Sequence, residues 1–221
     1  MIKKYIFCLL ALCCIGSISA QTLNQAKKMF DNEEYEKAKT AFAKAHLGMQ
    51  FFNKTTKRTY NAVVWGSPKS DTGTIVGNIT RNPRNRLQMC VSSDESVGKY
   101  AVTHYRVLER MSYVSLVECN LETGRTHQIR VHMKHIGHIL FNDDVYGGDE
   151  ILKGTNFSKY SQFVRNCFKM CPRQALHAKT LGFIHPTTGK EMFFDSELPE
   201  DFKNLINAWQ VYSAASASYT D

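Results

Sequence analysis

Two arginines and two histidines lie close together in Leu121–His132, the segment of this sequence best equipped for chemistry. The arginines are Arg125 and Arg130, and the histidines are His127 and His132. Guanidinium groups pair with phosphates and carboxylates, and imidazoles exchange protons near neutral pH. The segment therefore predicts a binding site for a negatively charged ligand.

A turn and an apolar stripe are predicted to hold these side chains on ordered backbone. Thr123-Gly124 is typical of a turn and supplies a glycine that is free to take a positive φ. The next residues include Ile129, Val131 and Met133, which are apolar and can be buried. We therefore expect a helix over about residues 125–135 that fixes the arginines.

The histidines of this region also raise a metal hypothesis, because three of them follow one another at intervals of three: His132, His135 and His138. Successive spacings of three drift around a helix, so we expect no metal site. Asp143 and Asp144 precede a Tyr-Gly-Gly turn and are predicted to form a cap or turn hydrogen bond, with a catalytic role as the alternative. No cofactor is expected.

The charge of the chain favours an anionic partner. The 221 residues include 28 Lys and Arg against 20 Asp and Glu, for a formal net charge of +8. Such an excess is typical of proteins that bind nucleic acid or a membrane surface. The length allows one domain, or one domain with a small appendage.

The first twenty residues have the pattern of a secretory signal peptide. Lys3 and Lys4 precede an apolar run over residues 5–15, and small residues follow it. The run is too short to span a membrane, so we expect no stable membrane association after cleavage. This signal predicts export to the periplasm.

Four cysteines follow the signal segment and are expected to be reduced, partly buried thiols, as in a cytosolic fold: Cys90, Cys119, Cys167 and Cys171. Their number is even but sparse, and no Cys-x-x-Cys spacing accompanies them. The cysteines therefore favour the cytosol, whereas the signal peptide favours export.

Residues 21–45 form a separate element in this interpretation. Apolar residues recur at helical spacing around a turn at Asp31-Asn32, namely Ala26, Phe30, Tyr35, Ala38 and Phe42. The pattern resembles one tetratricopeptide unit. A single helix pair cannot bury its own apolar face, so the alternative is a short amphipathic hairpin that packs on something else.

The remainder predicts an α+β fold with a mixed, largely antiparallel sheet. Strands are expected over residues 59–65, 73–79, 86–91, 100–108 and 113–121. Helices are expected over residues 125–135, 159–168 and 199–209. Residues 46–210 would form this domain, and residues 211–221 a flexible tail.

Several motifs, in order along the chain, resemble the RluA-type (ribosomal large-subunit) pseudouridine synthases, which isomerise uridine in ribosomal and transfer RNA. The motifs are Lys57–Ala62, Thr103–Glu109, Glu122–His132 with Gly137-His138 and Tyr146–Gly148, and Arg173–Ala178 with Phe183–Pro186 and Leu198-Pro199. The resemblance covers about residues 43–209. It implies that residues 46–210 are a partial catalytic domain, whose sheet is truncated at its amino-terminal side.

The resemblance also implies roles for individual residues. Tyr60 would pack on the flipped uracil, and Arg125 would orient a catalytic aspartate. The alternatives are a half-buried strand tyrosine for Tyr60 and a surface ion pair with Glu122 for Arg125. The predicted RNA contacts are Lys57, Arg58, Thr126, His127, Arg130 and Lys134, and a less secure strip adds Arg81, Arg84 and Arg86.

The family's catalytic aspartate lies in a His-Arg-x-Asp-x-x-Thr-Ser-Gly motif, and this sequence contains no such motif. Counting back from Ala38-Lys39 along the family's spacing reaches about Lys28, which is no carboxylate; Asp31 is the nearest substitute. The strands around that motif are also missing, so we expect an unpaired sheet edge and exposed apolar residues.

Three functional hypotheses follow. The first is a pseudouridine synthase family protein, a monomer that acts on ribosomal or transfer RNA, with little or no activity because the aspartate motif is absent. The second is a catalytically inactive RNA-binding remnant, and the third is an exported interaction protein. The family implies the cytoplasm, whereas the signal implies export, so the compartment stays open.

Overall fold

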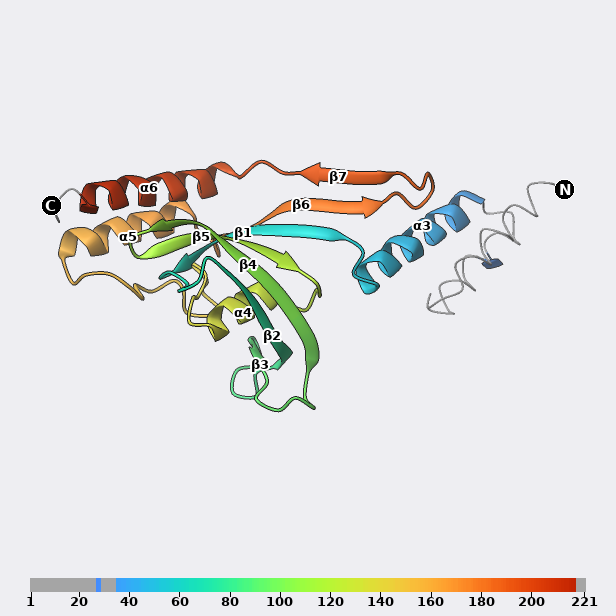
Figure 1. Cartoon of the computed structure of the whole chain (residues 1–221), viewed down its shortest axis with the longest axis horizontal. Helices are drawn as coiled ribbons and strands as arrows, with labels where there is room; N and C mark the ends of the chain where they lie inside the picture. Colours follow the sequence, from blue (N-terminus) through green and yellow to red (C-terminus); the bar gives the residue numbers. More distant parts are fainter. Residues whose placement is uncertain (1–26, 29–34, 218–221) are drawn as a thin grey trace. The chain divides into compact units, whose positions relative to one another are not determined.

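The computed structural model describes residues 27–28 and 35–217 of the chain (Figure 1). These residues fall into two compact units. The first holds the described residues up to 56 together with Gly182–Phe193, and the second holds Lys57–Leu181 and residues 194–217. The candidate site residues named above all lie in the second unit.

The first unit contains the helix α3, Tyr35–Phe52. The side-chain amide of Gln50 holds the backbone of Ile184: Nε2 donates to its carbonyl and Oε1 accepts its N–H, both at 2.7 Å. The helix continues past residue 45, where the predicted hairpin ends. The signal segment and the predicted turn at Asp31-Asn32 lie outside the described residues.

A seven-stranded sheet has the order β3-β2-β4-β5-β1-β6-β7. Strand β5 pairs antiparallel with β1 and β4, and β2 pairs antiparallel with β4 and β3. The prediction of an α+β fold with a largely antiparallel sheet is confirmed. The strands are β1 (Lys57–Trp65), β2 (Thr72–Arg81), β3 (Met89–Val91), β4 (Lys99–Met111), β5 (Val114–Leu121), β6 (Leu176–Ile184) and β7 (Glu191–Asp195).

Strand β3 begins three residues later than expected, because Asn85 extends the preceding turn. Its side-chain oxygen accepts the N–H of Leu87 at 3.1 Å, and its carbonyl accepts the N–H of Gln88 at 3.0 Å. Such a local hydrogen bond competes with strand pairing. Strands β6 and β7 were not predicted, since polar residues interrupt β6 and β7 has only five residues.

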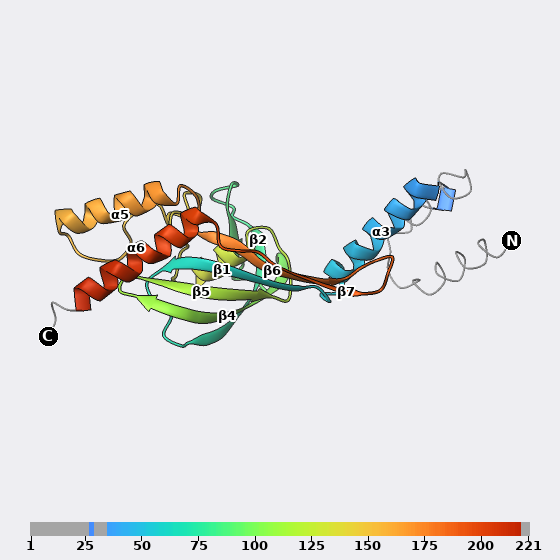
Figure 2. The same cartoon turned by 90° about the horizontal axis from the view of Figure 1, so that it is seen from above.

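One face of the sheet packs against the helices α5, Ser158–Met170, and α6, Glu200–Ala217. These helices lie side by side (Figure 2). Val63 and Trp65 of β1 point to this face and enter an aromatic core. Helix α6 continues through Ala217, so the described part of the predicted tail is helical.

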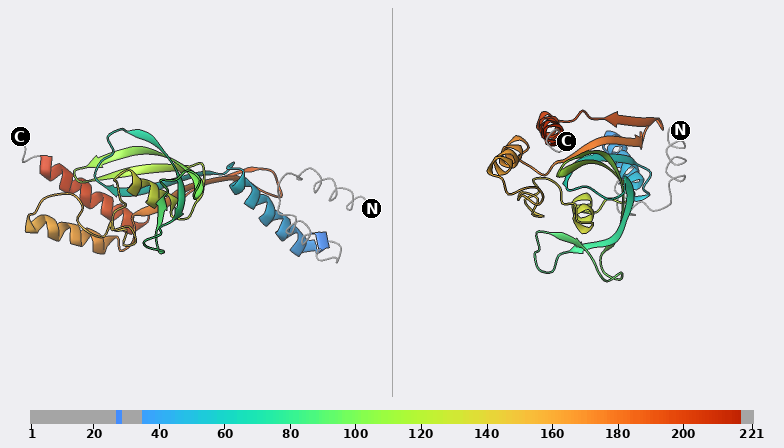
Figure 3. Two further views of the ribbon diagram at one scale, coloured as in Figure 1. Left: turned by 90° about the horizontal axis from the view of Figure 1, so that it is seen from below. Right: turned by 60° about the vertical axis from the view of Figure 1, so that its left-hand side comes forward.

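The other face packs against α4, Gln128–His135, around which the sheet curves (Figure 3). Ala62 and Val64 of β1 alternate with the residues of the aromatic face and meet Ile129 and Met133 of α4. The helix is followed by a left-handed glycine, Gly137, with φ of 84°.

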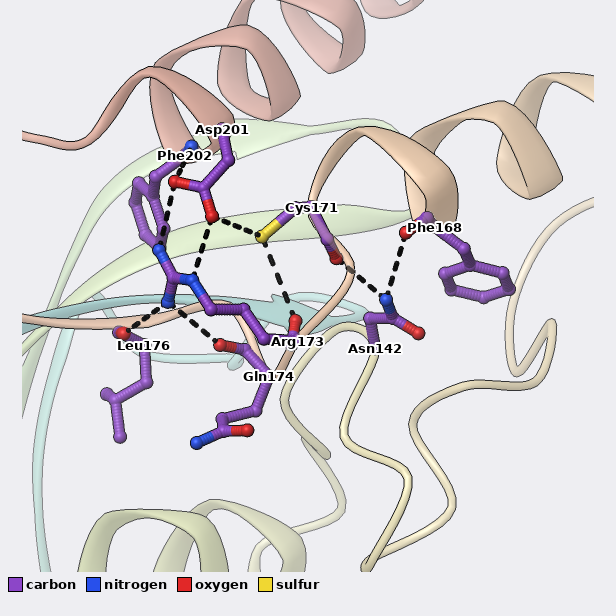
Figure 4. Close-up of polar contacts among 8 residues, drawn as sticks. All are labelled: Asn142, Phe168, Cys171, Arg173, Gln174, Leu176, Asp201 and Phe202. Atoms are coloured by element: carbon purple, nitrogen blue, oxygen red, sulfur yellow. Dashed lines mark hydrogen bonds and ion pairs between the residues drawn. The ribbon is translucent and has the colours of Figure 1, made fainter.

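A polar cluster joins the end of α5, the start of β6 and the first turn of α6 (Figure 4). Arg173 donates from Nε and Nη2 to the carboxylate of Asp201 at 2.8 and 3.0 Å, and from Nη1 to the carbonyl of Leu176 at 3.0 Å. The hydrogen bond from Arg173 holds the pKa of Asp201 below its usual value. Asn142 donates to the carbonyls of Phe168 and Cys171, which fixes the end of α5.

Strand β7 is an edge of the sheet and carries exposed apolar side chains. Phe193 is 60% exposed and Phe194 is 51% exposed. The expectation of an unpaired edge left by the missing strands stays a prediction.

Two further expectations can be compared with the described residues. Cys119, Cys167 and Cys171 are buried, Cys90 is partly exposed, and all four are free thiols, as predicted. Burial raises the pKa of Cys119 and Cys167 to about 12. Among the described helices, none combines the length and hydropathy needed to cross a membrane.

Candidate functional site

A hollow of about 400 Å³ lies beside the turn that contains Arg125. Three of its lining side chains, those of Arg81, Lys99 and Arg125, are cationic, and none is acidic. The remaining lining residues are Ile79, Thr80, Met89, Gly98, Gly124 and Thr126. The hollow can therefore attract an anion and also offers apolar surface.

The half-buried Arg125 is fixed at its base and open at its tip. Its Nε donates to the carbonyl of Tyr100 at 3.0 Å, and its backbone N–H donates to Oε1 of Gln128 at 2.9 Å. Among the described residues, no hydrogen-bond partner holds its terminal nitrogens. A guanidinium held in this way can give two parallel hydrogen bonds to a phosphate.

Gly124, which is free to take a positive φ, does not do so. The left-handed residue of the turn is His127, with φ of 55°. The missing side chain of Gly124 instead makes room for Arg58, because a Cβ there would lie 2.8 Å from Nη1 of Arg58. Arg58 of β1 is thereby brought to the Arg125 turn.

His127 faces a buried tyrosine. Its Nδ1 lies 3.0 Å from the hydroxyl of Tyr146, which also accepts the N–H of Met89 at 3.0 Å. Burial and the nearby Arg130 lower the pKa of His127. A lowered pKa favours the neutral imidazole at pH 7, and its Nδ1 shares one hydrogen bond with the Tyr146 hydroxyl.

Arg130 is buried rather than solvated. Its Nε and Nη2 donate to the two carboxylate oxygens of Asp143 at 2.7 and 2.6 Å, and its guanidinium lies 4.8 Å from the Tyr146 ring centre. Asp143 also accepts the N–H of Tyr146 at 3.1 Å, as the turn interpretation predicted. With its side chain 10% exposed, Arg130 does not line the hollow.

Tyr60 and the two predicted lysines are placed separately from the hollow. Tyr60 is half-buried on β1 and packs on the apolar cluster under α4. Lys57 is exposed at the start of β1. Lys134 is exposed on α4, and its Nζ donates to the carbonyl of Tyr146 at 3.1 Å. None of these three residues lines the hollow.

The histidines of the α4 region point to different partners. His132 is fully buried and lies 2.9 Å from the hydroxyl of Thr103, and burial lowers its pKa to about 4. His138 donates from Nδ1 to the carbonyl of Trp65 at 3.0 Å, while His135 is exposed. Within the described part of the chain, no group of three potential metal ligands converges.

Sequence reasoning missed Gln128, Thr103 and Lys99. A buried glutamine at the start of a helix gives no signal in an apolar pattern, and Lys99 enters the hollow from a strand distant in sequence.

Known proteins resemble this chain over most of its length. An uncharacterized RNA pseudouridine synthase of Chlorobaculum parvum is 43% identical over 182 residues, covering 82% of this chain and 55% of that protein. The ribosomal large subunit pseudouridine synthase D of Zymomonas mobilis is 45% identical and covers 76% of this chain and 50% of its own length. The chain thus spans about half the length of these curated relatives.

A solved structure and a family model agree with these relatives. The human RNA pseudouridylate synthase domain containing 1 protein matches 68% of this chain and 58% of its own, with a TM-score of 0.52 and 26% identity. The model of the RNA pseudouridylate synthase family matches residues 19–135, which is more than half of the chain. This chain belongs to the RNA pseudouridine synthase family.

Proposed function

We propose that this chain binds structured RNA through the hollow beside Arg125 and has little or no uridine isomerase activity by itself. One observation carries the proposal: the hollow presents three cationic side chains and no carboxylate. The cations can hold the phosphates of an RNA, whereas the aspartate that the resemblance places at the sugar is missing from this sequence.

The cations support RNA as the ligand. Phosphate contacts from arginine and lysine supply most of the sequence-independent affinity for nucleic acid. Apolar surface from Ile79 and Met89 lies beside the three cations. Recognition of RNA favours loops and bulges, whose unstacked bases can meet such surface while their phosphates contact the cations.

The positions of two carboxylates near Arg125, those of Glu122 and Asp143, support the proposed lack of isomerase activity. Glu122 lies 2.7 Å from Nε2 of His104, and Asp143 is paired with Arg130. Neither lines the hollow. The resemblance assigns the glycosidic step to an aspartate in a motif that this sequence lacks, and neither of these two carboxylates is placed to replace it in the hollow.

The test measures binding and product formation on one RNA. An unmodified fragment of large-subunit ribosomal RNA is titrated with the purified chain, and pseudouridine is then mapped on the same RNA. We expect saturable binding and no pseudouridine above background, with a full-length relative as the positive control. Clear formation at a single uridine would contradict the proposed inactivity, and absence of binding would contradict the RNA-binding role.

A further inference from the structure

The buried amide of Gln128 uses all of its hydrogen-bonding capacity. Its Oε1 accepts the hydroxyl of Thr123 at 2.8 Å and the N–H of Arg125 at 2.9 Å. Its Nε2 donates to the carbonyl of Val102 at 2.9 Å and to the hydroxyl oxygen of Thr103 at 3.0 Å. Reversing the amide would place its NH2 against the Arg125 N–H and its oxygen against the Val102 carbonyl, so these two backbone groups fix its orientation.

The same contacts continue into a buried chain. The hydroxyl oxygen of Thr103, which accepts a hydrogen bond from Gln128, also lies 2.9 Å from Nδ1 of the buried His132. The hydroxyl oxygen of Thr123 accepts the N–H of Val102 at 3.0 Å. Strand β4, the Arg125 turn and α4 are thereby joined by one network of buried side chains.

Gln128 holds Arg125 at two backbone atoms. The side chain of Gln128 accepts the Arg125 N–H, and the backbone N–H of Gln128 donates to the Arg125 carbonyl at 3.0 Å. The backbone from Glu122 to His127 forms neither helix nor strand, so no ladder of backbone hydrogen bonds fixes it. These two contacts therefore set the direction in which the Arg125 side chain leaves the chain.

We propose that Gln128 is a positioning residue that aims Arg125 into the hollow, with Thr103 holding the Gln128 amide in place. Packing alone does not require an amide here, because an unbranched apolar side chain of similar size would fill the same space. Burying the Gln128 amide costs desolvation free energy, and its hydrogen bonds fix the side chain in one orientation. The effect on RNA binding rests on the proposed function.

The first test measures amide hydrogen exchange in the whole protein. In Gln128→Met the Arg125 amide loses its acceptor, so its exchange should accelerate about tenfold, as expected for loss of one local hydrogen bond, while the amide of Met133 keeps its protection. Unchanged exchange at Arg125, or equal acceleration at both amides, would overturn the proposal.

A matched pair of variants at position 103 extends this test. Thr103→Val removes the hydroxyl that holds Gln128 and keeps the shape of the side chain, whereas Thr103→Ser keeps the hydroxyl. Exchange at Arg125 should accelerate in the valine variant and stay near the wild-type rate in the serine variant. Equal rates in the two variants would contradict the part given to Thr103.

The second test is a double-mutant cycle on RNA affinity. If Gln128 acts through Arg125, Gln128→Met should weaken binding about fivefold in the wild-type background and less than about twofold in Arg125→Ala. Additive losses would overturn the proposal. If Arg125→Ala itself leaves the affinity unchanged, the proposed function fails, and the exchange measurement still decides whether Gln128 positions the turn.

Discussion

The sheet buries aromatic rings on its α5 and α6 face and hydrogen-bonded polar side chains on its α4 face. On the first face Trp209 meets Trp65 at 6.2 Å and Phe163 at 4.9 Å between ring centres, both edge to face. On the second, Gln128, His132 and the Arg130–Asp143 pair are all buried. The two faces of the sheet are therefore held by different interactions, aromatic packing on one and buried hydrogen bonds on the other.

The comparison separates stability from orientation. Aromatic burial stabilises without demanding one exact arrangement of each ring, and edge-to-face contacts add modestly to it. A buried polar network contributes little net stability, but its hydrogen bonds fix a unique geometry. The polar face is the one that carries the Arg125 turn, so we attribute its polarity to the placement of that arginine.

The largest expected effect is on the aromatic face. Trp209→Ala should lower the free energy of unfolding by about 3–5 kcal/mol, because it opens a cavity among packed rings. Urea titration followed by far-UV circular dichroism measures this loss. The nearby Val211→Ala is the control, since Val211 is 62% exposed and should lose less than about 0.5 kcal/mol. Similar losses in both variants would refute the assignment of the core.

The next effect contrasts the ion pairs of the two faces. Arg130→Met should cost about 3 kcal/mol, because it leaves the buried carboxylate of Asp143 unpaired. Arg173→Met should cost about 1 kcal/mol, because the side chains of Arg173 and Asp201 remain 35% and 27% exposed. Urea titration of both variants tests the ranking, and an equal or reversed order would contradict it.

A smaller effect concerns acid stability. The pKa of His132 is about 4 when folded and 6.5 as the ordinary value, so the unfolded chain binds the extra proton between those pH values. Stability therefore falls as the pH drops from 6.5 toward 4, by about 2 kcal/mol at pH 4.5 from this group alone.

The variant His132→Asn isolates this group, because it keeps an acceptor near Nδ1 and cannot take up a proton. Its free energy of unfolding, measured at pH 7 and at pH 4.5, should change less between the two values than that of the wild type. An identical change in the two proteins would show that His132 does not titrate in this range.

The smallest expected effect is a difference in reactivity between buried and partly exposed thiols. Cys119 lies on the α4 face and Cys167 on the aromatic face, and burial raises the pKa of both thiols to about 12. Both should resist iodoacetamide in the folded protein, whereas the partly exposed Cys90 should react. Peptide mapping after brief labelling tests this order, and early labelling of Cys167 would show that the aromatic face opens readily.

The sequence was informative where patterns are local. The strand-like run of β1 and the apolar residues of α4 predicted both elements, because their side chains are buried in the cores. It failed for Arg130, whose partner Asp143 lies 13 positions away and is met only through folding. It failed for Gln128 for the same reason, since its partners lie on β4 and in the preceding turn.

The most direct test of the central claim is the salt dependence of RNA binding, measured by fluorescence anisotropy on a structured fragment of large-subunit ribosomal RNA. Arg165→Ala is the control, because Arg165 is exposed on α5, across the sheet from α4. We expect Arg125→Ala to weaken binding and to reduce the slope of log affinity against log salt by about one, with Arg165→Ala near the wild type. An unchanged slope in Arg125→Ala, or equal losses in both variants, would contradict a phosphate-binding role for Arg125.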